Sequence, residues 1–148
     1  MKTFSTQVRV GAEHIDRGNH ANWRAQLAIV EDVHFSLRQE LGLGLEQLRE
    51  NCDLFLMMYN VKDIFYRKEL RLGDMIDVEI VMWISGRTCL EFRCLFKKDR
   101  EIATEMSWVM PLVSVNNGRP HKIPQWMIDA IGVEKPDFAK SLPALAVS

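Results

Sequence analysis

Alternating apolar and polar side chains predict strands along most of this chain. Such an alternation runs from Phe4 to Ala12, which is typical of a half-buried strand. Further alternations predict strands over 76–84, 90–96 and 102–110, and a long apolar segment covers 54–66. Glycine-containing or polar turns separate these runs, at Gly73-Asp74, at Gly86 and at 98–100.

One segment has a helical period instead. Between about His20 and Leu41, apolar side chains recur at intervals of three and four residues, which marks one face of a helix. The stripe consists of Trp23, Leu27, Val30, His34, Leu37 and Leu41. Because further apolar residues lie off the stripe, we expect the helix to be largely enclosed. Shorter helices are expected over 45–51 and 124–131.

Antiparallel strands with one enclosed helix between the first and the second predict an α+β domain. The simplest packing is a curved antiparallel sheet wrapped around the helix. Its edge strands are unpaired, so we expect edge-to-edge dimerisation. We expect a single domain over 1–148, with a core over about 4–131 and a loosely held tail over 132–148.

The charge, cysteine content and apolar runs of the chain argue against several classes of function. The chain has 148 residues, with 19 Lys and Arg against 20 Asp and Glu, so general affinity for nucleic acid or an anionic membrane surface is not expected. Three cysteines without a Cys-x-x-Cys motif suggest neither a disulfide framework nor a zinc site, and no histidine spacing suggests another metal. No apolar run reads as a signal peptide or a membrane span, so we expect a cytoplasmic protein.

Three passages carry a family resemblance. Residues 16–23 read Asp-Arg-Gly-Asn-His-Ala-Asn-Trp, residues 64–74 contain Tyr-Arg-Lys and a later Gly-Asp, and residues 117–124 read Asn-Gly-Arg-Pro-His-Lys-Ile-Pro. In this order they resemble the hotdog-fold acyl-CoA thioesterases, in the branch similar to 4-hydroxybenzoyl-CoA thioesterase, over about residues 4–131. Asn19 and Trp23 stand where that family has a glycine and an asparagine.

The resemblance implies a thioesterase site before the long helix. Asp16 would be the catalytic carboxylate, and His20 and Asn22 would position the thioester or the attacking water. The N–H groups at the helix start would bind the developing oxyanion. The residues alone leave plainer roles open: Asp16 satisfying loop amides, Asn19 or Asn22 capping the helix, and His20 exposed at the surface.

From the same resemblance, further residues are expected to contact the substrate. They would come from Asn19, Trp23, Tyr66, Arg67, Lys68 and Arg87, of which Tyr66, Arg67 and Arg87 would contact CoA. The segment 87–100 has five basic and two acidic residues, which suits phosphates but also suits a solvated strand face. Some apolar residues could line an acyl groove, although core packing is favoured for most of them: Met57, Met58, Phe65, Trp83 and Trp108.

Other polar residues have weaker claims. Glu31 is the second candidate for the catalytic carboxylate, because another branch of the fold takes it from the long helix. His34 lies on the apolar stripe and is expected to be a hydrogen-bonded core histidine. Cys89 and Cys94 lie on opposite faces of one strand and are expected to be packing residues.

The favoured function is hydrolysis of an acyl-CoA, or acyl carrier protein, thioester by a homodimer or homotetramer with its sites at subunit interfaces. No cofactor is implied beyond the coenzyme A of the substrate. A non-catalytic acyl-CoA or lipid-binding hotdog module is the alternative. A hotdog hydratase or dehydratase is less favoured, because its His-Pro-rich or Asp-x-x-x-x-His loop is not evident.

Overall fold

One six-stranded antiparallel sheet organises the computed structural model, which describes residues 1–137. The strands run in the spatial order β1-β4-β5-β6-β2, and β3 also pairs with β6. Since β2 pairs with 112–114 and β3 with 104–109, β2 and β3 form one interrupted strand along the same edge. The strands are β1 Lys2–Arg9, β2 Leu54–Leu56, β3 Asn60–Tyr66, β4 Met75–Ile84, β5 Cys89–Lys98 and β6 Glu101–Ser114.

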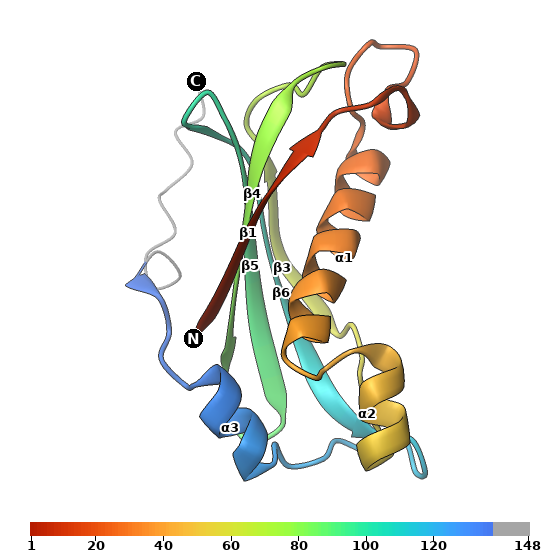
Figure 1. The fold of residues 1–148 in the computed structure, drawn as a ribbon, viewed down its shortest axis with the longest axis vertical. Helices are drawn as coiled ribbons and strands as arrows, with labels where there is room; N and C mark the ends of the chain where they lie inside the picture. The colour runs from red at the N-terminus through yellow and green to blue at the C-terminus, as the bar shows by residue number, and fades with distance from the viewer. Residues whose placement is uncertain (138–148) are drawn as a thin grey trace.

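The long helix α1, Trp23–Glu40, runs alongside one face of the curved sheet (Figure 1). It follows β1 and a short 3-10 turn, Ala12–His14. Two shorter helices, α2 Leu45–Cys52 and α3 Gln125–Ile131, agree with the expected segments, and Pro124 is the N-cap of α3. The predicted α+β arrangement of a curved antiparallel sheet around a central helix is therefore confirmed.

The core lies between α1 and the sheet face that it covers. Alternate residues of β4 point into it, and these side chains are fully buried: Ile76, Val78, Ile80 and Met82. Their partners on α1 include Ile29, Val33 and Leu37. Burying each such side chain contributes about 1.5–3 kcal/mol, so this layer holds α1 against the sheet.

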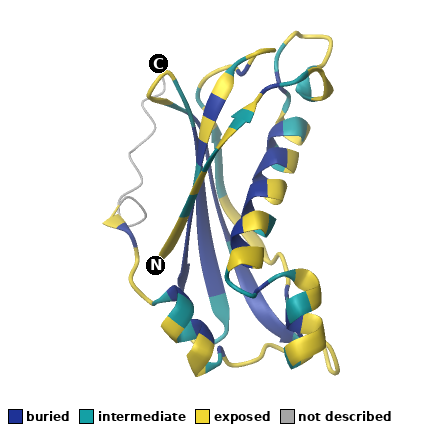
Figure 2. Ribbon diagram, in the orientation of Figure 1, coloured by how far each residue is buried: buried dark blue, intermediate teal, exposed yellow. Residues whose placement is uncertain are grey.

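The expected enclosure of the helix is wrong for one face. Figure 2 shows α1 buried on the side toward the sheet and exposed on the side away from it. Glu31 and Asp32 are among the exposed residues of the helix. Trp23, the first residue of the predicted stripe, is 61% exposed, whereas Gln26 and Arg38 are buried. Trp23 is the first residue of α1, whereas Val30, His34 and Leu37 of the same stripe lie further along the helix and are buried.

The edge formed by β2 and β3 carries exposed apolar side chains. They are Met57, Met58, Tyr59 and Val61, in and just before β3. Packing was the favoured role for Met57 and Met58, and the structure contradicts it. Trp83 and Trp108 are buried, as expected of core residues. The predicted tail over 132–148 falls mostly on residues 138–148, outside the described part of the chain.

Candidate active site

An open cleft of about 1010 Å³ lies at the start of α1. The loop before the helix forms one wall, and the end of β3 with the loop after it forms the other. Most of the residues predicted to form a site meet here, although they lie in two segments far apart in sequence. Those that line the cleft are Asp16, His20, Asn22, Trp23, Tyr66, Arg67 and Lys68.

A tight turn holds the carboxylate of Asp16 in place. Its Oδ1 accepts a hydrogen bond from the backbone N–H of Gly18 at 2.8 Å. The N–H of Asn19 donates to the backbone oxygen of Asp16 at 3.1 Å, and Asn19 has a φ of 62°, a conformation that asparagine tolerates better than most residues. Asn19 therefore shapes the turn and is absent from the cleft lining.

Asn22 joins this turn to the helix. Its Oδ1 accepts from the N–H of Ala25 at 2.9 Å, so Asn22 is the N-cap of α1. Its Nδ2 lies 3.4 Å from Oδ2 of Asp16 and donates to it. The capping role and the contact with Asp16 therefore belong to one side chain, and each Asp16 oxygen faces one donor.

His20 lies beside Asp16 across Gly18. A Cβ on Gly18 would lie 3.0 Å from Cε1 of His20 and 3.2 Å from Oδ1 of Asp16. The imidazole ring and the carboxylate therefore flank the same point above the backbone of Gly18. An acid–base group and a carboxylate thus face one end of the cleft together.

The helix start supplies further donors. Within α1 the N–H group of Ala25 donates to the side chain of Asn22, and that of Gln26 donates to the backbone oxygen of Asn22. Among residues 1–137, the N–H groups of Trp23 and Arg24 have no such partner. The positive end of the helix dipole lies at the same place, so the site favours a developing negative charge.

The second wall is tied directly to the helix start. The N–H of Ala21 donates to the backbone oxygen of Leu70 at 2.7 Å, and the side chain of Leu70 is fully buried. Tyr66, at the end of β3, is half-exposed, and burial of the phenol raises its pKa. The distance between the two walls is thus fixed by backbone contacts.

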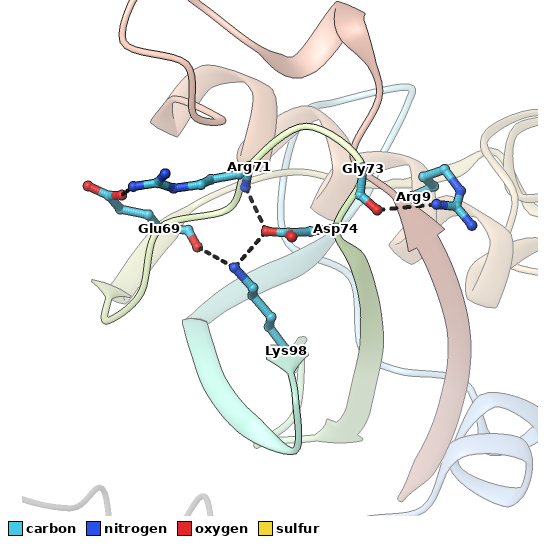
Figure 3. A network of polar contacts seen from close by, with 6 residues as sticks. All are labelled: Arg9, Glu69, Arg71, Gly73, Asp74 and Lys98. Carbon is cyan, nitrogen blue, oxygen red and sulfur yellow. Dashed lines mark hydrogen bonds and ion pairs between the residues drawn. The ribbon is translucent and has the colours of Figure 1, made fainter.

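A polar network holds the loop of this second wall (Figure 3). Nζ of Lys98 lies 2.7 Å from Oδ2 of Asp74, which also accepts from the N–H of Arg71 at 2.7 Å. Arg71 in turn pairs with Glu69 at 2.9 Å. The hydrogen bond from Arg71, with the charges of Arg71 and His20, holds the pKa of Glu69 below its usual range.

Most of the basic residues expected to meet phosphates have carboxylate partners. Nη2 of Arg67 lies 3.1 Å from Oε2 of the buried Glu105, which Arg93 also approaches at 3.5 Å. Similar pairs join Lys68 to Glu101, Lys97 to Glu79 and Lys98 to Asp74. The local basic excess over 87–100 is therefore largely compensated by charge from other elements.

Two candidates lie away from the cleft. Arg87 sits in the turn between β4 and β5, where its backbone oxygen accepts from the N–H of Ile123, so the structure does not bring it to the cleft of its own chain. Glu31 is an exposed residue of α1 and does not line the cleft.

His34 is a core histidine, as expected. It is buried against the rings of Phe92 and Trp108, and one ring nitrogen lies 2.9 Å from the backbone oxygen of Glu31. Burial, together with the charge of Arg38, lowers its pKa to about 4. Cys94 is also buried, which raises the pKa of its thiol and leaves it a packing residue.

Four cleft residues were missed from the sequence: Ala21 and the three polar residues Arg24, Gln26 and Glu69. Arg24 and Glu69 gave no signal, because exposed charges in a helix and a loop are common. Gln26 did give a signal in the sequence, because it lies four residues before Val30 and therefore shares the buried face of the helix. A polar side chain on an apolar face is a sign of a specific partner.

Within residues 1–137 the structure holds no cluster of three His, Cys, Asp or Glu side chains suited to a metal ion. No helix in that range is both long enough and apolar enough to span a bilayer.

Comparisons with known proteins place the fold. No protein-family model matches the chain, and no curated protein does. Among solved structures, a 1,4-dihydroxy-2-naphthoyl-CoA thioesterase from Synechocystis matches with a TM-score of 0.79 and 14% identity, over 88% of this chain and 96% of that one. A Staphylococcus aureus protein solved in complex with CoA matches at 0.80 and 22%, over 99% and 90%.

A third match shares the same fold. It is a DHNA-CoA thioesterase from Staphylococcus aureus, with a TM-score of 0.73 and 12% identity, over 87% of this chain and 86% of that one. At these identities, the likeness of all three structures to this chain lies in the fold. The expected hotdog fold of the thioesterases is therefore confirmed.

Proposed function

We propose that this protein is a thioester hydrolase that cleaves an acyl-CoA or an acyl carrier protein thioester. The observation that carries the proposal is the position of Asp16, whose carboxylate is held by Gly18 and Asn22 beside the unpaired N–H groups that begin α1. A carboxylate next to oxyanion donors is what acyl transfer requires. The hotdog fold shared with named thioesterases supports the same class.

Two chemical routes lead to the same products. In the first, an Asp16 oxygen attacks the thioester carbon, the C–S bond breaks, and water hydrolyses the resulting anhydride. In the second, Asp16 takes a proton from a water molecule that attacks the carbonyl carbon itself. In both, negative charge develops on the carbonyl oxygen, where the N–H groups of Trp23 and Arg24 would stabilise it. The products are a carboxylic acid and a thiol.

The remaining cleft residues would bind the substrate. His20 and Asn22 flank Asp16 and would orient the thioester, whereas Trp23 and Tyr66 offer exposed aromatic surface on the two walls. Arg67 and Lys68 border the cleft, so they would contact the phosphates of coenzyme A in addition to their partners Glu105 and Glu101. We propose no cofactor beyond the coenzyme A of the substrate.

The test is free-thiol release across a panel of aromatic and straight-chain acyl-CoAs. The wild-type protein should release thiol, and Asp16→Asn should lower kcat by about 100-fold or more while its Tm stays within a few degrees. Asp32→Asn is the matched control, because Asp32 is an exposed residue of α1. Unchanged turnover in Asp16→Asn would refute the assignment of the carboxylate.

One observation favours a second function, acyl-CoA binding without hydrolysis. Both oxygens of Asp16 already accept hydrogen bonds, from Gly18 and from Asn22, which suits a carboxylate with a purely structural role. Acyl-CoA that binds in calorimetry but releases no thiol would select this function.

We also propose that the functional unit is a homodimer or homotetramer. The outer side of β3 is unpaired within the described chain, and Met57, Met58 and Tyr59 are exposed beside it. Antiparallel pairing of two β3 edges would bring a second copy next to Tyr66 and thus next to the cleft. A cytoplasmic location stays a prediction.

A further inference from the structure

Gln26 is a buried amide at the floor of the cleft. It lies in the first turn of α1, lines the cleft, and is only 5% exposed. Helical side chains lean toward the helix start, and Gln26 does so, since its amide contacts the backbone oxygen of Ala21. The amide therefore lies near the level of Asn22, which donates to Asp16.

The orientation of this amide is fixed by its two partners. A backbone oxygen only accepts, so the Gln26 atom that lies 3.3 Å from the oxygen of Ala21 must be Nε2. The other amide atom is then Oε1, which lies 2.5 Å from Oγ1 of Thr104. The hydroxyl of Thr104 must therefore donate, and a flipped amide would put two acceptors against each other.

One donor remains after this accounting. Nε2 carries two hydrogens, and the contact with Ala21 uses one. Among residues 1–137 the second has no partner. An unsatisfied N–H is unfavourable in a buried position, so a preoriented donor that borders a cleft indicates a ligand atom that accepts it.

We infer that Gln26 donates this second N–H to the carbonyl oxygen of the bound acyl group, and that Thr104 is the positioning residue that orients the amide. The inference rests on the proposed function, because it assumes an acyl thioester in the cleft. It adds a side-chain donor to the N–H groups of Trp23 and Arg24. The ligand must therefore carry an uncharged oxygen that accepts a hydrogen bond close to the sulfur of coenzyme A.

Binding of two thioethers of coenzyme A tests this without any turnover. Phenacyl-CoA has a carbonyl one methylene away from the sulfur and cannot be hydrolysed as a thioester, whereas 2-phenylethyl-CoA lacks the carbonyl. Calorimetry should show that the wild-type protein prefers phenacyl-CoA. Gln26→Met, which keeps the length of the side chain, should reduce that preference by about five- to tenfold.

The role of Thr104 has its own readout. Thr104→Val should reduce the preference for phenacyl-CoA, since the amide is then free to turn, and Thr104→Ser should restore it because the hydroxyl returns. In thiol-release assays Gln26→Met should lower kcat more than it raises KM, since the carbonyl contact strengthens as charge develops.

Three results would overturn the inference. The first is an equal preference for phenacyl-CoA in the wild type and in Gln26→Met, and the second is an equal loss of affinity for both thioethers, which indicates a structural role. The third is no binding of either thioether to the wild-type protein. If acyl-CoAs release no thiol while the carbonyl preference depends on Gln26, hydrolysis is wrong and the inference holds.

Discussion

The amide nitrogen of Asn22 lies 3.4 Å from Oδ2 of Asp16, while the oxygen of the same amide caps α1. The helix that would bind the oxyanion and the carboxylate that would react are therefore positioned by one side chain. Stability and activity should then respond differently to different substitutions of Asn22, because only some of them remove both contacts.

We predict that Asn22→Ser keeps the fold and loses activity. A serine still caps a helix, but its shorter side chain carries no amide to reach Asp16. The Tm should stay within a few degrees, and kcat should fall by about tenfold. Asn22→Ala should lower kcat similarly and also destabilise the protein by about 1 kcal/mol, as the cap is lost. Thermal unfolding and thiol release measure both effects, and full activity in Asn22→Ser would exclude the contact from the mechanism.

Gly18→Ala is predicted to damage the site and spare the fold. The new Cβ would lie 3.0 Å from Cε1 of His20 and 3.2 Å from Oδ1 of Asp16, so both groups must shift. The required shift is a few tenths of an ångström. A misplacement of about 1 Å can cost about 100-fold in rate, so this smaller shift should lower kcat by about tenfold. Gly11→Ala is the matched control, because the atoms nearest to its Cβ would belong to the flexible carboxylate of Glu13. If both variants have the same kcat, His20 and Asp16 do not act together.

The sequence predicts the fold better than it predicts the site. Strands and helices follow from local periods, and the turn at 98–100 and the N-cap of α3 fall where the pattern puts them. Asp16, His20 and Asn22 are close in sequence, so their proximity could be anticipated as well. Tyr66 and Lys68 could be assigned to the same site only through the family resemblance. Their position near the helix start depends on the long-range contact of Ala21 with Leu70, which no local pattern predicts.

Charge partners could not be predicted from local pattern. Arg93 is paired with Glu105 and Lys98 with Asp74, so the basic excess counted over 87–100 is largely compensated in three dimensions. The predicted burial of Trp23 is wrong for a different reason. Periodicity places a side chain on a face of a helix, but it does not say where along the helix the core ends.

The stability of the protein should depend on pH through His34. Burial lowers the pKa of His34 to about 4 in the folded state, while an unfolded histidine has a pKa near 6.5, so the unfolded chain binds more protons between these values. Its contribution is therefore fully present above about pH 6.5 and is lost as the pH falls toward 4. The loss is of the order of 3 kcal/mol.

Urea unfolding at pH 7.5 and pH 5 measures this dependence. In His34→Gln the difference between the two free energies of unfolding should shrink by about 1–2 kcal/mol, because His34 no longer takes up a proton on unfolding. The other three histidines, His14, His20 and His121, remain in both proteins and serve as an internal control. An identical difference in the variant would mean that another group determines the acid sensitivity.

Association through the β3 edge gives the last prediction. Val61 is exposed and apolar on that edge, so Val61→Lys should place like charges close together if two β3 strands pair across a two-fold axis. Light scattering should then show a shift from dimer or tetramer toward monomer. Val133→Lys is the matched control, since Val133 is an equally apolar, exposed residue outside every strand. The rate of thiol release should fall in the Val61→Lys monomer as well, because the cleft at Tyr66 would lose the neighbouring copy of the chain. Dimers that survive the substitution would place the interface elsewhere.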